Sequence, residues 1–200
     1  MARAQEPSRL VADLSSVPGV RLKLDEPLAR YTSMKIGGPA DYFIEADHGA
    51  ALAAVLIALR RHRVPLCLLG NGSNVLVSDR GVRGAVIHLT GEFKKIEWRE
   101  VGENIAVEVG AAYAVTQLVR QAARKGYAGL EFAEGIPGSV GGALVMNAGA
   151  YGSEIEKVVE RVDAITHDGQ ALVFSRAEMT FSYRDSHLPA GTVVTGVVLR

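Results

Sequence analysis

The residues of this chain that could bind a ligand are concentrated in glycine-rich turns, the longest of which covers residues 132–152. Glycine recurs there at positions 135, 138, 141, 142, 149 and 152. Each glycine costs backbone entropy unless a special conformation or a close approach requires it, so the run predicts a loop wrapped against a ligand rather than an ordinary helix or strand. Ser139 offers a hydroxyl, and the N–H groups around Gly138 and Gly141 are unshielded, which suits a phosphate. Tight turns joining strands are the alternative.

A second cluster, Gly70-Asn71-Gly72-Ser73-Asn74, directly follows an apolar run. It is not a dinucleotide fingerprint, because Val75 and a strand-like segment follow where that motif needs a third glycine and a helix. A Walker loop is also excluded, since no Gly-Lys-Ser/Thr follows either cluster. The two amides and the hydroxyl suit a diphosphate, whereas a hairpin held by Asx-turns is the alternative. Together with Ile36-Gly37-Gly38-Pro39, the clusters predict three turns that converge on one extended ligand.

Length and composition narrow the class of protein. The chain has 200 residues, of which 48% are apolar, enough for one large domain or two lobes. Its 22 basic and 22 acidic residues balance, so no electrostatic footprint for nucleic acid or an anionic membrane is expected. The single cysteine, Cys67, lies in an apolar run and is expected to be a buried, inert thiol. No signal peptide or run of about 20 apolar residues is found, which predicts a cytoplasmic location.

The elements that must position these turns indicate an α+β fold rather than a doubly wound sheet, because strands outnumber helices and do not alternate regularly with them. Residues 1–19 are expected to form an N-terminal arm, 20–90 a first lobe and 91–200 a second lobe. Helices are predicted over 50–64, with Asp47 as N-cap, and over 115–125, ending at Gly126. A capping box is predicted from Ser175 to Glu178. The predicted strands cover 65–69, 74–77, 85–89, 96–98, 105–109, 158–166, 171–174 and 192–199.

Five blocks of the sequence resemble, in order and spacing, those of the UDP-N-acetylenolpyruvoylglucosamine reductase (MurB) family, and they cover about residues 20–200. The blocks are Tyr31-Thr32-Ser33-Met34-Lys35-Ile36-Gly37-Gly38-Pro39-Ala40, Gly70-Asn71-Gly72-Ser73-Asn74, Gly135-Ile136-Pro137-Gly138-Ser139-Val140-Gly141-Gly142-Ala143, Asn147-Ala148-Gly149-Ala150-Tyr151-Gly152 and Tyr183-Arg184-Asp185-Ser186.

The resemblance implies two FAD-binding lobes of the vanillyl-alcohol-oxidase/PCMH type, followed in the family by a substrate-binding third domain that is absent from this chain. It implies a reductase in which a non-covalently bound FAD takes a hydride from NADPH and reduces UDP-N-acetylglucosamine enolpyruvate to UDP-N-acetylmuramate, a precursor of peptidoglycan. The family's proton-donating serine and late glutamate have no counterpart here. The chain, which ends in a strand-like run, is therefore expected to be truncated, to bind FAD and to turn over little. A monomer with no nucleic-acid or membrane partner is expected.

The resemblance also implies roles for individual residues. Arg184 is the expected catalytic residue, because a guanidinium stabilises the enolate-like charge that hydride addition builds beside a carboxylate. A surface arginine paired with Asp185 is the alternative. Tyr151 is expected at the substrate, and Tyr31 is a further candidate there, with packed aromatic rings as the alternative. The expected cofactor-binding residues are Ile36, Gly37, Gly38, Gly70, Asn71, Gly72, Ser73, Asn74, Gly135, Ile136, Gly138, Ser139, Gly141, Gly142 and Tyr183.

Two other functions stay open at this point. One is a flavoprotein oxidase or dehydrogenase of the same fold that acts on another small molecule, against which the Tyr-Arg-Asp-Ser block argues. The other is a non-catalytic nucleotide-binding module. No metal site is expected, because the five histidines are scattered without ligand spacing.

Overall fold

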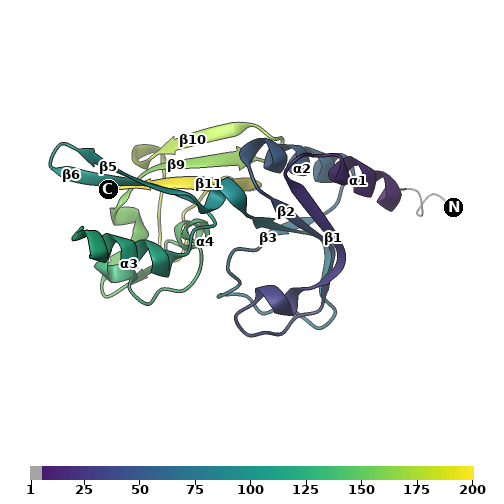
Figure 1. The fold of residues 1–200 in the computed structure, drawn as a ribbon, viewed down its shortest axis with the longest axis horizontal. Coiled ribbons are helices and arrows are strands. Elements are labelled where there is room, and N and C mark those ends of the chain that lie inside the picture. Colours follow the sequence, from purple (N-terminus) through teal and green to yellow (C-terminus); the bar gives the residue numbers. More distant parts are fainter. Residues whose placement is uncertain (1–5) are drawn as a thin grey trace. The chain divides into compact units, whose positions relative to one another are not determined.

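The computed structural model describes residues 6–200, which form two compact units (Figure 1). Unit 1 contains the residues up to Gly91 together with Ile165–Gln170. Unit 2 contains Glu92–Ala164 and Ala171–Arg200. The division after Gly91 lies one residue from the lobe boundary predicted at 90. The return of 165–170 to unit 1 was not anticipated. It reflects a turn that packs on a helix of unit 1, where Asp168 pairs with Arg60.

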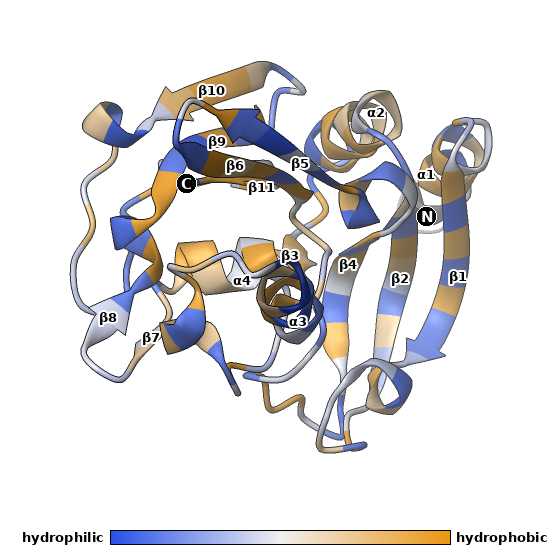
Figure 2. Cartoon of the chain, turned by 60° about the vertical axis from the view of Figure 1, so that its left-hand side comes forward, coloured by the Kyte–Doolittle hydropathy of each residue, from blue (hydrophilic) through white to orange (hydrophobic). Residues whose placement is uncertain are grey.

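Unit 1 is built on a four-stranded sheet with the order β1-β2-β4-β3. Strands β1 and β2 are antiparallel, whereas β4 is parallel to both β2 and β3. Figure 2 shows hydrophilic and hydrophobic residues alternating along β1, as in a strand with one half-buried face. The elements of unit 1 are α1 (Glu6–Ser15), β1 (Val20–Pro27), η2 (Leu28–Tyr31), β2 (Pro39–Ala46), α2 (Gly49–Arg61), β3 (Leu66–Leu68) and β4 (Val82–Leu89).

The core of unit 1 lies on both faces of this sheet. Helix α2 buries Leu52, Val55, Leu56 and Leu59, the spacing of one helical face. A second cluster joins Leu28, Ala40, Phe43, Leu69 and Val86. Tyr31 and Val77 pack against this second cluster, so the core fixes the two segments that carry the sequence motifs of unit 1.

The expected N-terminal arm is only partly correct. Residues 1–5 lie outside the described residues, but α1 occupies 6–15 and buries Leu10 and Leu14. The helix packs on α2 and β1. Asp13 also bonds His62 across 2.8 Å, which lowers the pKa of the Asp13 carboxyl. The polar composition of this segment concealed two leucines one helical turn apart.

Three further expectations for unit 1 are wrong. Residues 74–77 form no strand, because only Val77 reaches the core while Leu76 is 73% exposed. Cys67 is exposed rather than buried, because β3 is an edge strand. The N-cap of α2 is His48, with Asp47 one residue earlier and bonded to its ring.

Unit 2 is built on a five-stranded sheet with the order β10-β9-β11-β6-β5. The strands predicted at 96–98, 105–109, 158–166 and 171–174, the helix ending at Gly126 and the capping box from Ser175 to Glu178 are confirmed. The capping box also lowers the pKa of Glu178, which accepts two hydrogen bonds from Ser175. The elements are η3 (Gly91–Lys94), β5 (Ile96–Val101), β6 (Asn104–Gly110), α3 (Val115–Lys125), η4 (Glu131–Ala133), α4 (Val140–Val145), β7 (Gly149–Ala150), β8 (Ser153–Glu154), η5 (Ile155–Lys157), β9 (Val159–Thr166), β10 (Ala171–Ser175), η6 (Arg176–Glu178) and β11 (Thr192–Leu199).

The glycine-rich run at 132–152 contains a short helix, α4, contrary to expectation. Ser139 caps it by accepting a hydrogen bond from Gly142 N–H, and Val140, Ala143 and Leu144 are buried. A Cβ at Gly141 would lie 2.9 Å from Ala111 Cβ, so this glycine allows the helix to approach residues 110–113. At least one glycine of the run therefore serves packing rather than a ligand.

Candidate functional site

The two glycine motifs of unit 1 contact each other directly. Ser33 N–H donates to Gly72 O at 3.0 Å, and Gly38 N–H donates to Ser78 O at 2.9 Å. Gly72 adopts φ +63°, and a Cβ there would lie 2.0 Å from Tyr31 O. A Cβ at Gly38 would lie 2.0 Å from Asp79 O. The structure thus brings the segment 31–38 and the loop 70–81 together, and it does so through approaches that only glycine permits.

The loop at 70–74 leaves polar groups available to a ligand. Asn71 and Asn74 are exposed and Ser73 is half-buried. Within residues 6–200, the side chains of these three residues make no hydrogen bond, although their amides and hydroxyl can donate and accept. The neighbouring exposed apolar side chains are Met34, Ile36, Val75 and Leu76. This combination suits a ligand with both a diphosphate and a flat apolar part, and it fits a dinucleotide such as FAD.

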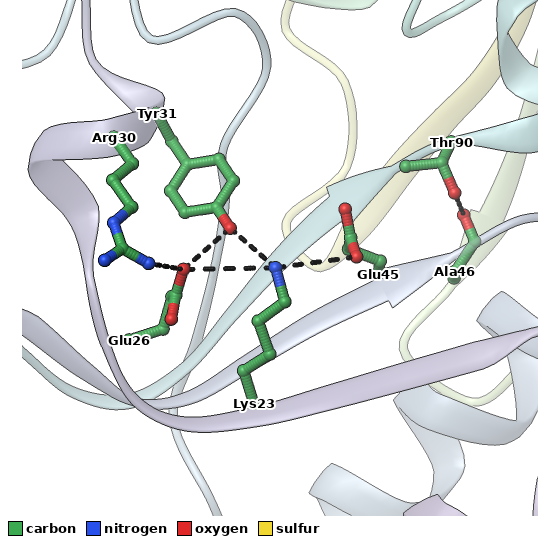
Figure 3. Close-up of polar contacts among 7 residues, drawn as sticks. All are labelled: Lys23, Glu26, Arg30, Tyr31, Glu45, Ala46 and Thr90. Carbon is green, nitrogen blue, oxygen red and sulfur yellow. Dashed lines mark hydrogen bonds and ion pairs between the residues drawn. The ribbon is translucent and has the colours of Figure 1, made fainter.

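Tyr31 does not present its hydroxyl to a ligand. The hydroxyl donates to Glu26 Oε1 at 2.9 Å and accepts from Lys23 Nζ at 2.9 Å, as Figure 3 shows. Its ring stacks on Phe43, with centroids 4.1 Å apart. The hydrogen bond from Lys23 raises the pKa of that ammonium group. The phenol therefore serves the interior of unit 1, which favours the packed-aromatic alternative over a substrate contact.

A Tyr31→Phe substitution tests whether the hydroxyl stabilises unit 1 rather than contacting a ligand. It keeps the stacked ring but removes the hydroxyl, so the free energy of unfolding should fall by about 0.5–1.5 kcal/mol, the usual loss for one partly buried hydrogen-bonded group. The affinity for FAD should not change. Urea unfolding and a fluorescence titration with FAD measure the two quantities, and a large loss of FAD affinity with unchanged stability would assign the hydroxyl to the ligand instead.

Unit 2 carries an open pocket of about 360 Å³. It brings together the Gly135–Pro137 turn, the Ala148–Tyr151 segment and Arg184, which three separate sequence blocks supply. Tyr151 is 86% exposed and takes a left-handed φ of +53°. The lining residues are Glu134, Gly135, Ile136, Pro137, Ala148, Gly149, Ala150, Tyr151 and Arg184.

Arg184 contacts this pocket rather than its neighbour Asp185. Both terminal guanidinium nitrogens donate to Gly149 O at 3.4 Å, and the guanidinium carbon lies 5.2 Å from the ring centroid of Tyr183. Asp185 instead pairs with His187, whose other ring nitrogen lies 2.7 Å from Ser182 Oγ. Arg184 is exposed and its two hydrogen bonds are long, so the cation is available to an anionic ligand.

The turn at 138–142 offers fewer groups than the sequence suggested. Gly141 N–H donates to Ala111 O at 2.8 Å, and Val140 N–H donates to Tyr113 O at 2.8 Å. Ser139 is buried and its oxygen accepts from Gly142 N–H. The expectation of free N–H groups around Gly141 is therefore wrong, because the carbonyls of Ala111 and Tyr113 and the Ser139 cap accept from them. Gly135, with φ +79° and no heavy atom within 4 Å of a Cβ placed there, stays open.

Asn147 has no role predicted from the sequence, although it is the first residue of the block Asn147-Ala148-Gly149-Ala150-Tyr151-Gly152. The structure buries this side chain completely and hydrogen-bonds it to both segments that carry Tyr151 and Arg184. An asparagine before Ala-Gly-Ala resembles an ordinary turn residue in sequence. Only its burial distinguishes it.

The comparisons with known proteins now identify the family. A family model described as an FAD-binding domain matches residues 40–175. The chain belongs to the FAD-binding domain family. FAD is therefore its cofactor, and the α+β fold expected from the sequence is confirmed.

The resemblance to MurB reductases is confirmed as well. The chain is 45% identical over 191 residues to UDP-N-acetylenolpyruvoylglucosamine reductase 1 of Bacillus cereus, covering 96% of this chain and 62% of that protein. It is 42% identical over 182 residues to reductase 2 of Symbiobacterium thermophilum, covering 91% and 58%. The crystal structure of MurB from Thermus caldophilus matches with a TM-score of 0.76 at 39% identity, covering 90% and 62%. The chain thus spans about three fifths of the length of these relatives.

More distant structures share the fold alone. The VAO-type flavoprotein MtVAO615 of Myceliophthora thermophila matches with a TM-score of 0.66 at 13% identity, covering 100% of this chain and 47% of that one. This likeness confirms the vanillyl-alcohol-oxidase type of fold. Separately, no helix among residues 6–200 is long and apolar enough to cross a membrane.

Proposed function

We propose that this chain forms the FAD-binding part of an NADPH-dependent UDP-N-acetylenolpyruvoylglucosamine reductase that serves peptidoglycan synthesis. The observation that carries the proposal is the unit 2 pocket, where Tyr151 and Arg184 line one space beside the Gly135–Pro137 turn. The 45% identity to a named reductase supports it. The monomeric state and the cytoplasmic location stay predictions.

The residues that would hold FAD lie in the glycine motifs. In unit 1, Asn71, Ser73 and Asn74 would bind the pyrophosphate through side-chain amides, a hydroxyl and adjacent main-chain N–H groups. In unit 2, the open Gly135 and the neighbouring Ile136 would line the flavin. When bound, FAD supplies hydride transfer between NADPH and the substrate.

Arg184 would act on the substrate itself. An enolpyruvyl group carries a carboxylate, and negative charge builds beside it when a hydride adds to its double bond. A fixed guanidinium binds a carboxylate through two parallel hydrogen bonds and stabilises that added charge. The Gly149 carbonyl orients the guanidinium by accepting from both of its terminal nitrogens. Tyr151, which also lines the pocket, would contact the same substrate.

Reconstitution of the purified chain with FAD tests the proposal. We expect a yellow protein with one FAD, whose flavin absorption changes when UDP-N-acetylglucosamine enolpyruvate is added. A matched titration with UDP-N-acetylglucosamine, which lacks the enolpyruvyl carboxylate, should produce a much weaker change.

Other outcomes would support the competing functions. Flavin uptake without any response to the enolpyruvyl substrate, together with rapid reoxidation by oxygen in the presence of an alcohol donor, would indicate an oxidase of the same fold. A colourless protein with no flavin absorbance after reconstitution would contradict FAD binding altogether.

A further inference from the structure

We propose that Asn147 is a positioning residue that holds the loop of Arg184 and the loop of Tyr151 in register with each other. The inference rests on the proposed function only in the roles given to Arg184 and Tyr151. Its structural content concerns unit 2 alone.

Asn147 lies where three segments meet. It follows the last turn of α4, with its own N–H donating to Leu144 O, and it adopts a left-handed φ of +39°. Asparagine tolerates this conformation better than most residues with a Cβ. The residue is completely buried.

The buried carboxamide of Asn147 makes three hydrogen bonds, to the segment 154–156 that follows Tyr151 and to Ser182, which precedes Arg184. Nδ2 donates to Glu154 Oε2 at 2.8 Å and to Ser182 O at 3.0 Å. Oδ1 accepts from Glu156 N–H at 3.3 Å. Two acceptors face the nitrogen and one donor faces the oxygen, so the orientation of the amide is determined by its partners.

These contacts reach the pocket residues through short paths. Glu154 lies in β8, which pairs with β7, and Tyr151 lies in the turn between these two strands. A Cβ at Gly149 would lie 2.3 Å from Ser153 O, so the hairpin is closed tightly. Ser182 begins the loop that carries Arg184, and Arg184 in turn donates to Gly149 O. Asn147 therefore bonds to the loop that carries Arg184 and also to the hairpin whose Gly149 carbonyl accepts from Arg184.

Neither alanine nor aspartate can make the contacts of Asn147. Alanine would leave the Ser182 carbonyl, the Glu156 N–H and one Glu154 oxygen without their buried partner. Aspartate would place a carboxylate against the carboxylate of Glu154 and the carbonyl of Ser182, which is repulsive. Only a primary amide on a short stem supplies two donors and an acceptor here.

Amide hydrogen exchange on the FAD-loaded chain tests the inference. Two amides serve as reporters: Ile155 N–H, which donates to Ala148 O in the hairpin, and Ser186 N–H, which donates to Val145 O from the Arg184 loop. In Asn147→Ala both should exchange at least about tenfold faster, because loss of a buried hydrogen-bonded partner lowers the local opening free energy. Amides of the β5–β6 hairpin should keep their wild-type rates. The control is Asn104→Ala, which removes an exposed amide from the first residue of β6, directly after the turn of that hairpin.

A double variant separates positioning from general stability. In Asn147→Asp/Glu154→Gln, the new glutamine can donate to the new carboxylate, which restores the contact to the hairpin in reverse. The Ser182 carbonyl still lacks a donor. We therefore expect the Ile155 reporter to recover its slow exchange and the Ser186 reporter to stay fast. This variant also carries the test if Asn147→Ala does not fold.

The outcomes are decisive in both directions. Wild-type exchange at both reporters in Asn147→Ala, an equal acceleration of every amide in unit 2, or recovery of both or neither reporter in the double variant would overturn the inference. A flavin titration with the enolpyruvyl substrate distinguishes it from the proposed function. If the wild-type chain gives no response, the reductase assignment fails, whereas the exchange rates still decide the role of Asn147.

Discussion

A Gly72→Ala substitution is expected to weaken FAD binding by at least about 30-fold, equivalent to roughly 2 kcal/mol. Gly72 has a left-handed φ of +63°, and the new Cβ would lie 2.0 Å from Tyr31 O and 2.8 Å from Thr32 Cα. Both neighbours are backbone atoms anchored by the core, so the 70–74 loop must move away from the 31–38 segment. Displacement of this loop would move the amides of Asn71 and Asn74 away from the pyrophosphate that we propose they bind. Titration of the apoprotein with FAD, followed by flavin fluorescence, measures the effect.

Gly102 provides the matched control for this prediction. It has a nearly identical φ of +61° but no heavy atom within 4 Å of the position of a Cβ. Gly102→Ala should therefore cost only the conformational penalty, about 1–2 kcal/mol of unfolding free energy, with unchanged FAD affinity. Equal effects of the two substitutions on FAD affinity would show that the close approach to Tyr31 is not what organises the loop.

Arg184→Met is expected to weaken binding of the enolpyruvyl substrate to the FAD-loaded chain by at least about 30-fold, because removal of one partner of a hydrogen-bonded charge pair costs about 2 kcal/mol or more. Methionine keeps most of the apolar stem but loses the charge and both donors to Gly149 O. The substrate affinity of Arg184→Lys should lie between those of the wild type and Arg184→Met, since an ammonium group keeps the charge without the planar pair of donors. The flavin difference spectrum as a function of substrate concentration gives the dissociation constants.

The affinity for FAD should stay at the wild-type value in both Arg184 variants. Arg124→Met, which removes an exposed guanidinium from the last turn of α3, is the control for a general effect of lost charge. If Arg184→Met keeps the wild-type substrate affinity, the guanidinium does not bind the substrate, and another group in the pocket must bind its carboxylate.

Local signals in the sequence were sufficient for most of the secondary structure. Helix α3 ends where Gly126 permits a left-handed residue, and the Ser175–Glu178 capping box forms as its spacing predicts. The errors occur where tertiary contacts override local preference. Residues 74–77 are rich in valine and leucine, yet they form a loop because Val77 alone packs on the core. Leu10 and Leu14 are buried because their helix, α1, packs against α2 and β1. The local sequence pattern does not reveal this packing.

The sequence by itself determined the order of the glycine-rich turns, because backbone conformations that require glycine leave a visible pattern. The cofactor class and the role expected for the arginine of the Tyr-Arg-Asp-Ser block came from the resemblance of five blocks to the MurB family. Only the tertiary structure decided which groups in those turns are available. It showed that the Ser139 cap and the carbonyls of residues 111 and 113 accept from the N–H groups near Gly141, and that the hydroxyl of Tyr31 is hydrogen-bonded within unit 1. It also showed that Asn147 bonds to both loops of the pocket. The physical reason is that hydrogen-bond partners and burial depend on segments that lie far apart in the chain, such as residues 147 and 182. Composition and local spacing do not indicate which of these distant segments come together.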